Sequence, residues 1–111
     1  MATDSGTIEN GIVEIDPKKM AEDFKAQANQ FFKLEKYSTA EELYSKAIEL
    51  DSTNAVYFAN RSIAHIKQES FGYALTDASK AIELDSTYTK AYYRYLHTYT
   101  VFEGKTLTIR C

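Results

Sequence analysis

The chain has 111 residues, of which 44% are hydrophobic and 26% are charged, and its net charge is -3 at pH 7. A chain of this length holds one small domain, and this balance of apolar and charged residues is that of a folded, water-soluble protein rather than a disordered one. The negative net charge argues against a general attraction to nucleic acid or to an anionic membrane surface.

The N-terminal segment, residues 1–16, is predicted to be a disordered acidic tail. It carries Asp4, Glu9 and Glu14, with no basic residue and no long apolar run up to Ile15, so it does not resemble a secretory signal. No other part of the sequence approaches the roughly eighteen apolar residues of a membrane span. We therefore expect an intracellular protein with no membrane span, in the cytoplasm and, as an alternative, also in the nucleus.

A repeat follows this tail. The string Lys-Ala-Ile-Glu-Leu-Asp-Ser-Thr occurs at residues 46–53 and again at 80–87, which is an offset of 34 residues (80 minus 46). Identical residues at the same offset extend over the rest of the period and include the pairs Ala21/Ala55, Phe24/Phe58, Ala40/Ala74 and Ala47/Ala81. Matches at small apolar positions across a whole period indicate a true repeat. The predicted units are 21–54, 55–88 and a partial unit over 89–102.

Each unit is predicted to consist of two helices. Asp16 followed by Pro17 is a typical N-cap and first-turn pair, and it opens the first helix. The segment Ser38-Thr-Ala-Glu41 has the pattern of a capping box, which predicts the start of the second helix. The second unit repeats the plan, with helices expected over about 54–68 and 72–84, and the third unit begins at Thr89.

Small and aromatic residues in the repeat predict how the helices pack. Alanines at positions 40, 47, 74 and 81 allow neighbouring helices to approach closely. Aromatic residues at positions 24, 58 and 92 are expected to fill the gaps between units.

A repeat of 34 residues with two helices, and with alanine at its twentieth and twenty-seventh positions, resembles the tetratricopeptide repeat (TPR). Phe24, Phe58 and Tyr92 stand at the fourth position, where that family prefers tryptophan or another aromatic residue. The resemblance covers about residues 18 to 94. It implies an all-α fold, namely an α-α superhelix (TPR solenoid) of about two and a half repeats, with the TPR domain over 17–94 and a divergent C-terminal tail over 95–111.

Within this family, several segments are similar to the N-terminal repeat domain of the serine/threonine-protein phosphatase 5 family. These segments are Phe24-Lys-Ala-Gln-Ala-Asn29, Ala59-Asn-Arg-Ser62, Glu69-Ser-Phe-Gly-Tyr-Ala-Leu75 and Thr89-Lys-Ala-Tyr-Tyr-Arg94. In that family three repeats and a capping helix precede a metal-dependent phosphatase domain. After Arg94 the sequence departs from the pattern, so we expect a chain truncated within the third repeat, such as a splice product. The metal-binding motifs of the phosphatase are absent, so we expect no enzyme activity and no cofactor in this chain.

Five polar residues on the predicted first helices form the candidate site. Lys25 and Asn29 are four residues apart and share one helical face, as do Lys90 and Arg94, and Asn60 lies on the middle first helix. Because first helices line the concave surface of a repeat superhelix, these five residues, called the clamp residues below, are expected to face one groove. Three cations and two amides with no acid among them are suited to binding carboxylates.

Similarity to chaperone-binding TPR domains implies a specific ligand for the clamp residues. In those domains the residues matching Lys25, Asn29 and Asn60 hold the terminal main-chain carboxylate of a Glu-Glu-Val-Asp peptide. The residues matching Lys90 and Arg94 contact the final aspartate side chain or the backbone near it. The resemblance therefore implies the C-terminal tails of Hsp90 and Hsp70 as partners and a co-chaperone-type targeting role for the domain.

Two alternatives remain open at this stage. The domain could be an autoinhibitory fragment that covers a phosphatase catalytic domain, or it could be a poorly functional truncated product. The second alternative rests on the aromatic face of the third unit, which the residues after it could cover as a flap or which could cause self-association. No catalytic residue is predicted. His65, His97 and the single cysteine, Cys111, lack partners at metal-ligand spacing and predict neither a metal site nor a disulfide.

Overall fold

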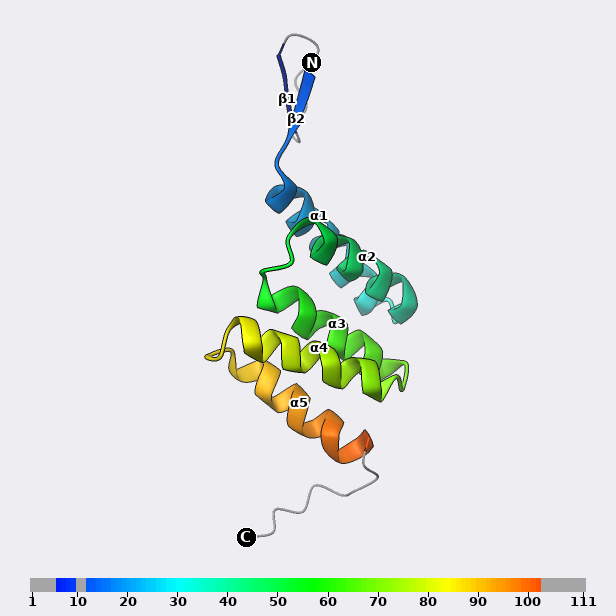
Figure 1. Ribbon diagram of the computed structural model, residues 1–111. Coiled ribbons are helices and arrows are strands. Elements are labelled where there is room, and N and C mark those ends of the chain that lie inside the picture. The colour runs from blue at the N-terminus through cyan, green and yellow to red at the C-terminus, as the bar shows by residue number, and fades with distance from the viewer. Residues whose placement is uncertain (1–5, 10–11, 103–111) are drawn as a thin grey trace.

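The computed structural model describes residues 6–9 and 12–102. Five helices dominate it, and each packs against the next along the chain, as Figure 1 shows from blue at the N-terminus to orange at the end of the last helix. Their bounds are α1 Pro17–Lys33, α2 Tyr37–Leu50, α3 Ala55–Lys67, α4 Phe71–Leu84 and α5 Thr89–Phe102. Two helix pairs and one further helix confirm the predicted all-α superhelix of about two and a half repeats.

The first helix of each complete unit begins at a side-chain cap. The Asp16 carboxylate accepts a hydrogen bond of 3.0 Å from the backbone N–H of Lys18, and Pro17 occupies the first helical turn. Asn54 caps α3 in the same way, because its side-chain oxygen accepts from the backbone N–H of Val56 at 2.9 Å. These local signals explain why the predicted starts of both helices agree with the structure.

The second helices begin differently from the prediction. Helix α2 begins at Tyr37, one residue before Ser38, and its N-cap residue Lys36 makes no side-chain capping bond. The capping box predicted over Ser38 to Glu41 is therefore wrong, because Ser38 already lies inside the helix. Helix α4 also begins without a side-chain cap, after Ser70.

A left-handed turn joins the two helices of each unit. Glu35 and Glu69 have φ angles of 62° and 61°, and they are 34 residues apart (69 minus 35). The backbone N–H of Lys36 donates to the carbonyl of Phe31 at 2.9 Å, and that of Ser70 donates to the carbonyl of His65 at 2.8 Å. This is the bonding pattern of a helix end closed by one residue in the left-handed region. The turn itself therefore sets the start of each second helix.

The core between the helices is built largely from alanine. Ala40, Ala47, Ala74 and Ala81 are all 0% exposed, which confirms their predicted role at the close helix contacts. Because these side chains are small, neighbouring helix backbones approach closely and bury one another.

The aromatic residues at the fourth position of the units do not all behave as predicted. Phe24 packs against a cluster of Ala21, Ala47 and Tyr57, which joins units one and two. Phe58 packs with alanines of α3, α4 and α5. Tyr92 is 46% exposed, so its predicted role between units is wrong. Among the described residues, the third unit has no second helix against which Tyr92 could pack.

The N-terminal segment also differs from its prediction. Gly6–Glu9 (β1) and Ile12–Ile15 (β2) pair as an antiparallel hairpin, in which Glu9 lies opposite Ile12, where a disordered tail was expected over residues 1–16. The β-branched residues of these runs favour extended backbone. Figure 1 shows the hairpin beyond the start of α1. Residues 1–5 and 103–111, which include most of the predicted divergent tail, lie outside the described residues.

The turns between units repeat a side-chain hydrogen-bond pattern. The Asp51 carboxylate accepts from the backbone N–H and the hydroxyl of Thr53, and Asp85 accepts in the same way from Thr87. These bonds hold the pKa of both aspartates below the ordinary value. In the part of the chain that the structure describes, no helix has the length and apolar character that crossing a membrane requires.

Candidate functional site

The clamp residues lie on the three first helices, as the sequence predicts. Lys25 and Asn29 are one turn apart on α1, Asn60 is on α3, and Lys90 and Arg94 are one turn apart on α5. Four of them are half-buried, whereas Lys90 is exposed. Their distribution over α1, α3 and α5 means that any ligand touching all five must contact every unit.

A buried tyrosine on α2 forms a hydrogen bond with one of the clamp residues. Tyr44, on α2, is 3% exposed, and its hydroxyl donates a short hydrogen bond to the side-chain oxygen of Asn29. Burial raises the pKa of Tyr44, and the positive charge of Arg94 opposes that rise.

The Arg94 guanidinium contains a buried donor. Within the described residues, its Nη1 is buried and has no hydrogen-bond partner. The Arg94 backbone carbonyl accepts a bond of 2.6 Å from the hydroxyl of Thr98, which is 0% exposed. A buried cationic N–H without a partner is unfavourable, so this atom fits an acceptor such as a carboxylate oxygen.

Lys25 has an acidic neighbour that the sequence analysis overlooked. Its Nζ lies 3.1 Å from Glu22 Oε1, three residues earlier on α1, so an acid lies beside the clamp residues although none is among them. Glu22 also accepts a bond of 2.5 Å from the Tyr57 hydroxyl on α3. This bond and the one from Lys25 hold the pKa of Glu22 below its ordinary value. The spacing of three residues could have revealed the pair.

The structure thus joins part of the predicted site. A hydrogen bond joins Asn29 to Tyr44, and Lys25 is paired with Glu22. Among the described residues, no side-chain hydrogen bond or ion pair links Asn60, Lys90 or Arg94 to these pairs. Tyr44 was missed because its position on α2 is that of a core residue.

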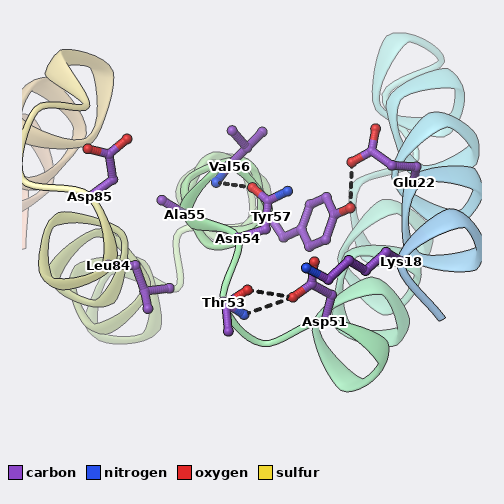
Figure 2. A pocket seen from close by; sticks show the side chains of 10 residues that line it. All are labelled: Lys18, Glu22, Asp51, Thr53, Asn54, Ala55, Val56, Tyr57, Leu84 and Asp85. Carbon is purple, nitrogen blue, oxygen red and sulfur yellow. Dashed lines mark hydrogen bonds between the residues drawn. The ribbon is translucent and has the colours of Figure 1, made fainter.

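A separate pocket of about 560 Å³ lies at the inter-unit turn and contains none of the clamp residues. Figure 2 shows Tyr57 pointing to Glu22, the bonds of Thr53 to Asp51 below it, and the bond of Val56 to Asn54 on the side of Tyr57 away from Glu22. Its charged side chains are Lys18, Glu22, Asp51 and Asp85. Three carboxylates against one ammonium group make the pocket unsuited to an acidic ligand.

A second polar cluster lies between α2, α3 and α4. Arg61 donates two hydrogen bonds of 2.8 Å to the Asp77 carboxylate, and one of 3.0 Å to the Ser45 hydroxyl. His65, which is 7% exposed, lies with its Nε2 3.4 Å from Asp77 and its Nδ1 3.7 Å from Glu41. No group of side chains that could hold a metal ion is found among the residues that the structure describes. This cluster ties the second unit to its neighbour through charge-assisted hydrogen bonds.

The chemistry of the clamp residues is that of hydrogen-bond donation to an anion. Arg94 and the two lysines provide charged donors, and each asparagine provides an NH₂ group. No nucleophile with an adjacent base is formed by them. The arrangement is therefore suited to binding a ligand with more than one carboxylate.

Comparison with known protein sequences finds similarity to serine/threonine phosphatases. No family model matches the chain. Serine/threonine-protein phosphatase 5 of Homo sapiens is 54% identical to it over 76 residues, which cover 68% of this chain and 15% of the relative. The chain thus spans only a small part of the length of that relative.

Comparison with solved structures gives repeat domains with bound peptides. The second TPR domain of Spaghetti (RPAP3), bound to the HSP90 peptide SRMEEVD, has a TM-score of 0.76 and 37% identity, covering 78% of this chain and 81% of that one. The second TPR domain of human RPAP3, in complex with the HSP70 peptide SGPTIEEVD, has a TM-score of 0.76 and 36% identity, covering 79% of this chain and 73% of that one.

Proposed function

The chain belongs to the tetratricopeptide-repeat family, and from this we propose that it binds the C-terminal Glu-Glu-Val-Asp peptide of Hsp90 and Hsp70 chaperones through its clamp residues. The similar domains are bound to peptides that end in this sequence. Such a peptide carries a main-chain carboxylate and an aspartate carboxylate at its end, which suits a site with two groups of donors.

The observation that carries this proposal is the buried, unpartnered Nη1 of Arg94. A ligand carboxylate would supply the acceptor that this N–H needs, and Asn29 would donate its NH₂ group nearby. The bond from Tyr44 already holds the Asn29 side chain, so the ligand does not need to order that side chain on binding. Lys25 must exchange its bond to Glu22 for one to the ligand, and an exposed pair of this kind is weak.

Calorimetric titration with the peptide Ser-Arg-Met-Glu-Glu-Val-Asp tests the proposal. We expect binding on the order of micromolar, because a short extended peptide loses conformational entropy when it binds. Arg94→Ala should weaken binding about ten- to a hundred-fold, since a charged hydrogen bond contributes roughly 1.5–3 kcal/mol.

The controls distinguish binding at the clamp residues from a general attraction to positive charge. Lys67→Ala, which removes an exposed cation elsewhere on α3, should leave binding unchanged. The same peptide with an amidated C-terminus should bind far more weakly than the free acid. The proposal fails if the double variant Lys25→Ala and Arg94→Ala binds the free acid as tightly as the unmodified chain does.

We also propose that this segment serves as the recognition domain of a metal-dependent serine/threonine phosphatase. The support is its 54% identity to a part of a protein with that activity in its name. The clamp residues provide binding chemistry rather than a nucleophile and base, so hydrolysis must come from other residues. A phosphatase assay of the isolated chain with Mn²⁺ and p-nitrophenyl phosphate should show no turnover, and turnover by the chain alone would refute this division of roles.

A further inference from the structure

We propose that Tyr44 is a positioning residue of the peptide site, and that its hydrogen bond to Asn29 makes the site select a carboxylate over a carboxamide at the end of the ligand. This inference rests on the proposed peptide binding. The contact that carries it is the short bond from the Tyr44 hydroxyl to the Asn29 side-chain oxygen.

An asparagine side chain can face a ligand in two ways. One orientation presents the NH₂ group, which donates, and the other presents the oxygen, which accepts. The two orientations fill nearly the same space, so neighbouring hydrogen bonds decide between them. The Tyr44 hydroxyl occupies the Asn29 oxygen as a donor, and this leaves the NH₂ group of the half-buried Asn29 for the ligand.

The Tyr44 hydroxyl is the donor in this pair. The structure pairs its hydrogen with the Asn29 oxygen, and a phenolic hydroxyl has only one hydrogen to donate. Burial raises the pKa of Tyr44, so the hydroxyl keeps this hydrogen at neutral pH.

The orientation therefore passes from Tyr44 to Asn29. Tyr44 is 3% exposed and belongs to a buried cluster with Ala28 and Ala40, so its ring has little freedom to move. The NH₂ group of Asn29 is then left for the ligand, and it adds to the charged donors of the other clamp residues. A group of donors attracts a carboxylate, whereas the NH₂ group of a carboxamide would meet another donor.

The test is Tyr44→Phe, which keeps the ring and removes only the hydroxyl. The peptide Ser-Arg-Met-Glu-Glu-Val-Asp is titrated by calorimetry as the free acid and with an amidated C-terminus. We expect the free acid to bind about tenfold more weakly to the variant, and the preference for acid over amide to shrink. A variant that keeps the full preference overturns the inference.

Two further variants distinguish positioning from a general loss of structure. Tyr37→Phe is the matched control, because Tyr37 lies on the same helix, is half-buried and packs through its ring, edge-on, against Phe32; it should bind like the unmodified chain. In an Asn29→Ala background, Tyr44→Phe should have no further effect on binding. An equal loss with and without Asn29 means that Tyr44 does not act through that amide, and this overturns the inference.

A measurement without ligand separates this inference from the proposed function. The side-chain NH₂ signals of Asn29, assigned by their absence in Asn29→Ala, should shift in the ¹H–¹⁵N spectrum of Tyr44→Phe and stay unchanged in Tyr37→Phe. If the unmodified chain binds neither peptide, the proposed function fails while the spectrum still reports on the amide. Unshifted Asn29 signals in Tyr44→Phe refute the positioning role directly.

Discussion

At the scale of single residues, polar side chains add hydrogen bonds between units whose alanine core supplies only apolar contacts. The Tyr57 hydroxyl on α3 donates to Glu22 on α1 at 2.5 Å, so one hydrogen bond connects the first helices of two units. Burial, followed by this bond, raises the pKa of Tyr57 well above its ordinary value. The same bond is the largest cause of the lowered pKa of Glu22.

The lowered pKa of Glu22 predicts a pH dependence of stability. Its stabilising effect is present above the carboxyl pKa of the unfolded chain and is lost as the pH falls through the lower pKa of the folded state. Tyr57→Phe should therefore lower the Tm at pH 7, and the difference from the unmodified chain should narrow near pH 3. Thermal unfolding followed by circular dichroism at several pH values measures this.

Two comparisons make that experiment decisive. Tyr93→Phe, at a position 75% exposed, should change the Tm little at either pH. Since the pKa of Tyr57 is raised rather than lowered, its own ionisation begins only in alkaline solution and does not disturb the acidic range. A Tm difference that stays constant from pH 7 to pH 3 would show that the Glu22 bond is not its source.

At the scale of elements, the left-handed turn at Glu35 and Glu69 explains a failure of the sequence analysis. The capping box at Ser38 to Glu41 fits a common pattern, but the turn at Glu35 closes α1 and leads directly into α2 at Tyr37. A glutamate that adopts the left-handed conformation cannot be recognised from the sequence, because glycine usually occupies that position. By contrast, the caps Asp16 and Asn54 could be predicted because their side chains act locally.

This turn also offers a stabilising substitution. A left-handed conformation costs an L-residue about 1–2 kcal/mol, and glycine avoids most of that cost while losing more entropy on folding. Glu69→Gly should therefore raise the free energy of unfolding by about 1 kcal/mol, which urea denaturation measures as a higher midpoint with an unchanged slope. Glu69→Ala, which keeps the β-carbon, should bring no such gain. Equal midpoints for the two variants would contradict the assignment of strain to this turn.

At the scale of the whole molecule, the repeat period largely determines the architecture. Identical residues 34 positions apart imply identical local structure, so the structure predicted for one unit also applies to the other. The close helix contacts at the repeated alanines could be predicted in the same way. The site is less accessible to such reasoning. The period places the clamp residues on first helices, but the bond from Tyr44 to Asn29 joins the second helix of a unit to its first. This bond depends on how the two helices pack against each other, which the spacing of residues within one helix does not give.

The bond from Tyr57 to Glu22 also has a mechanical consequence. In a solenoid each unit ordinarily touches only its neighbours, so the stack can be stretched like an open spring. Here a hydrogen bond joins α3 of the second unit to α1 of the first. A force that pulls these two units apart must therefore break this bond as well as the apolar contacts of the interface. A peptide that contacts α1, α3 and α5 together would resist the same extension.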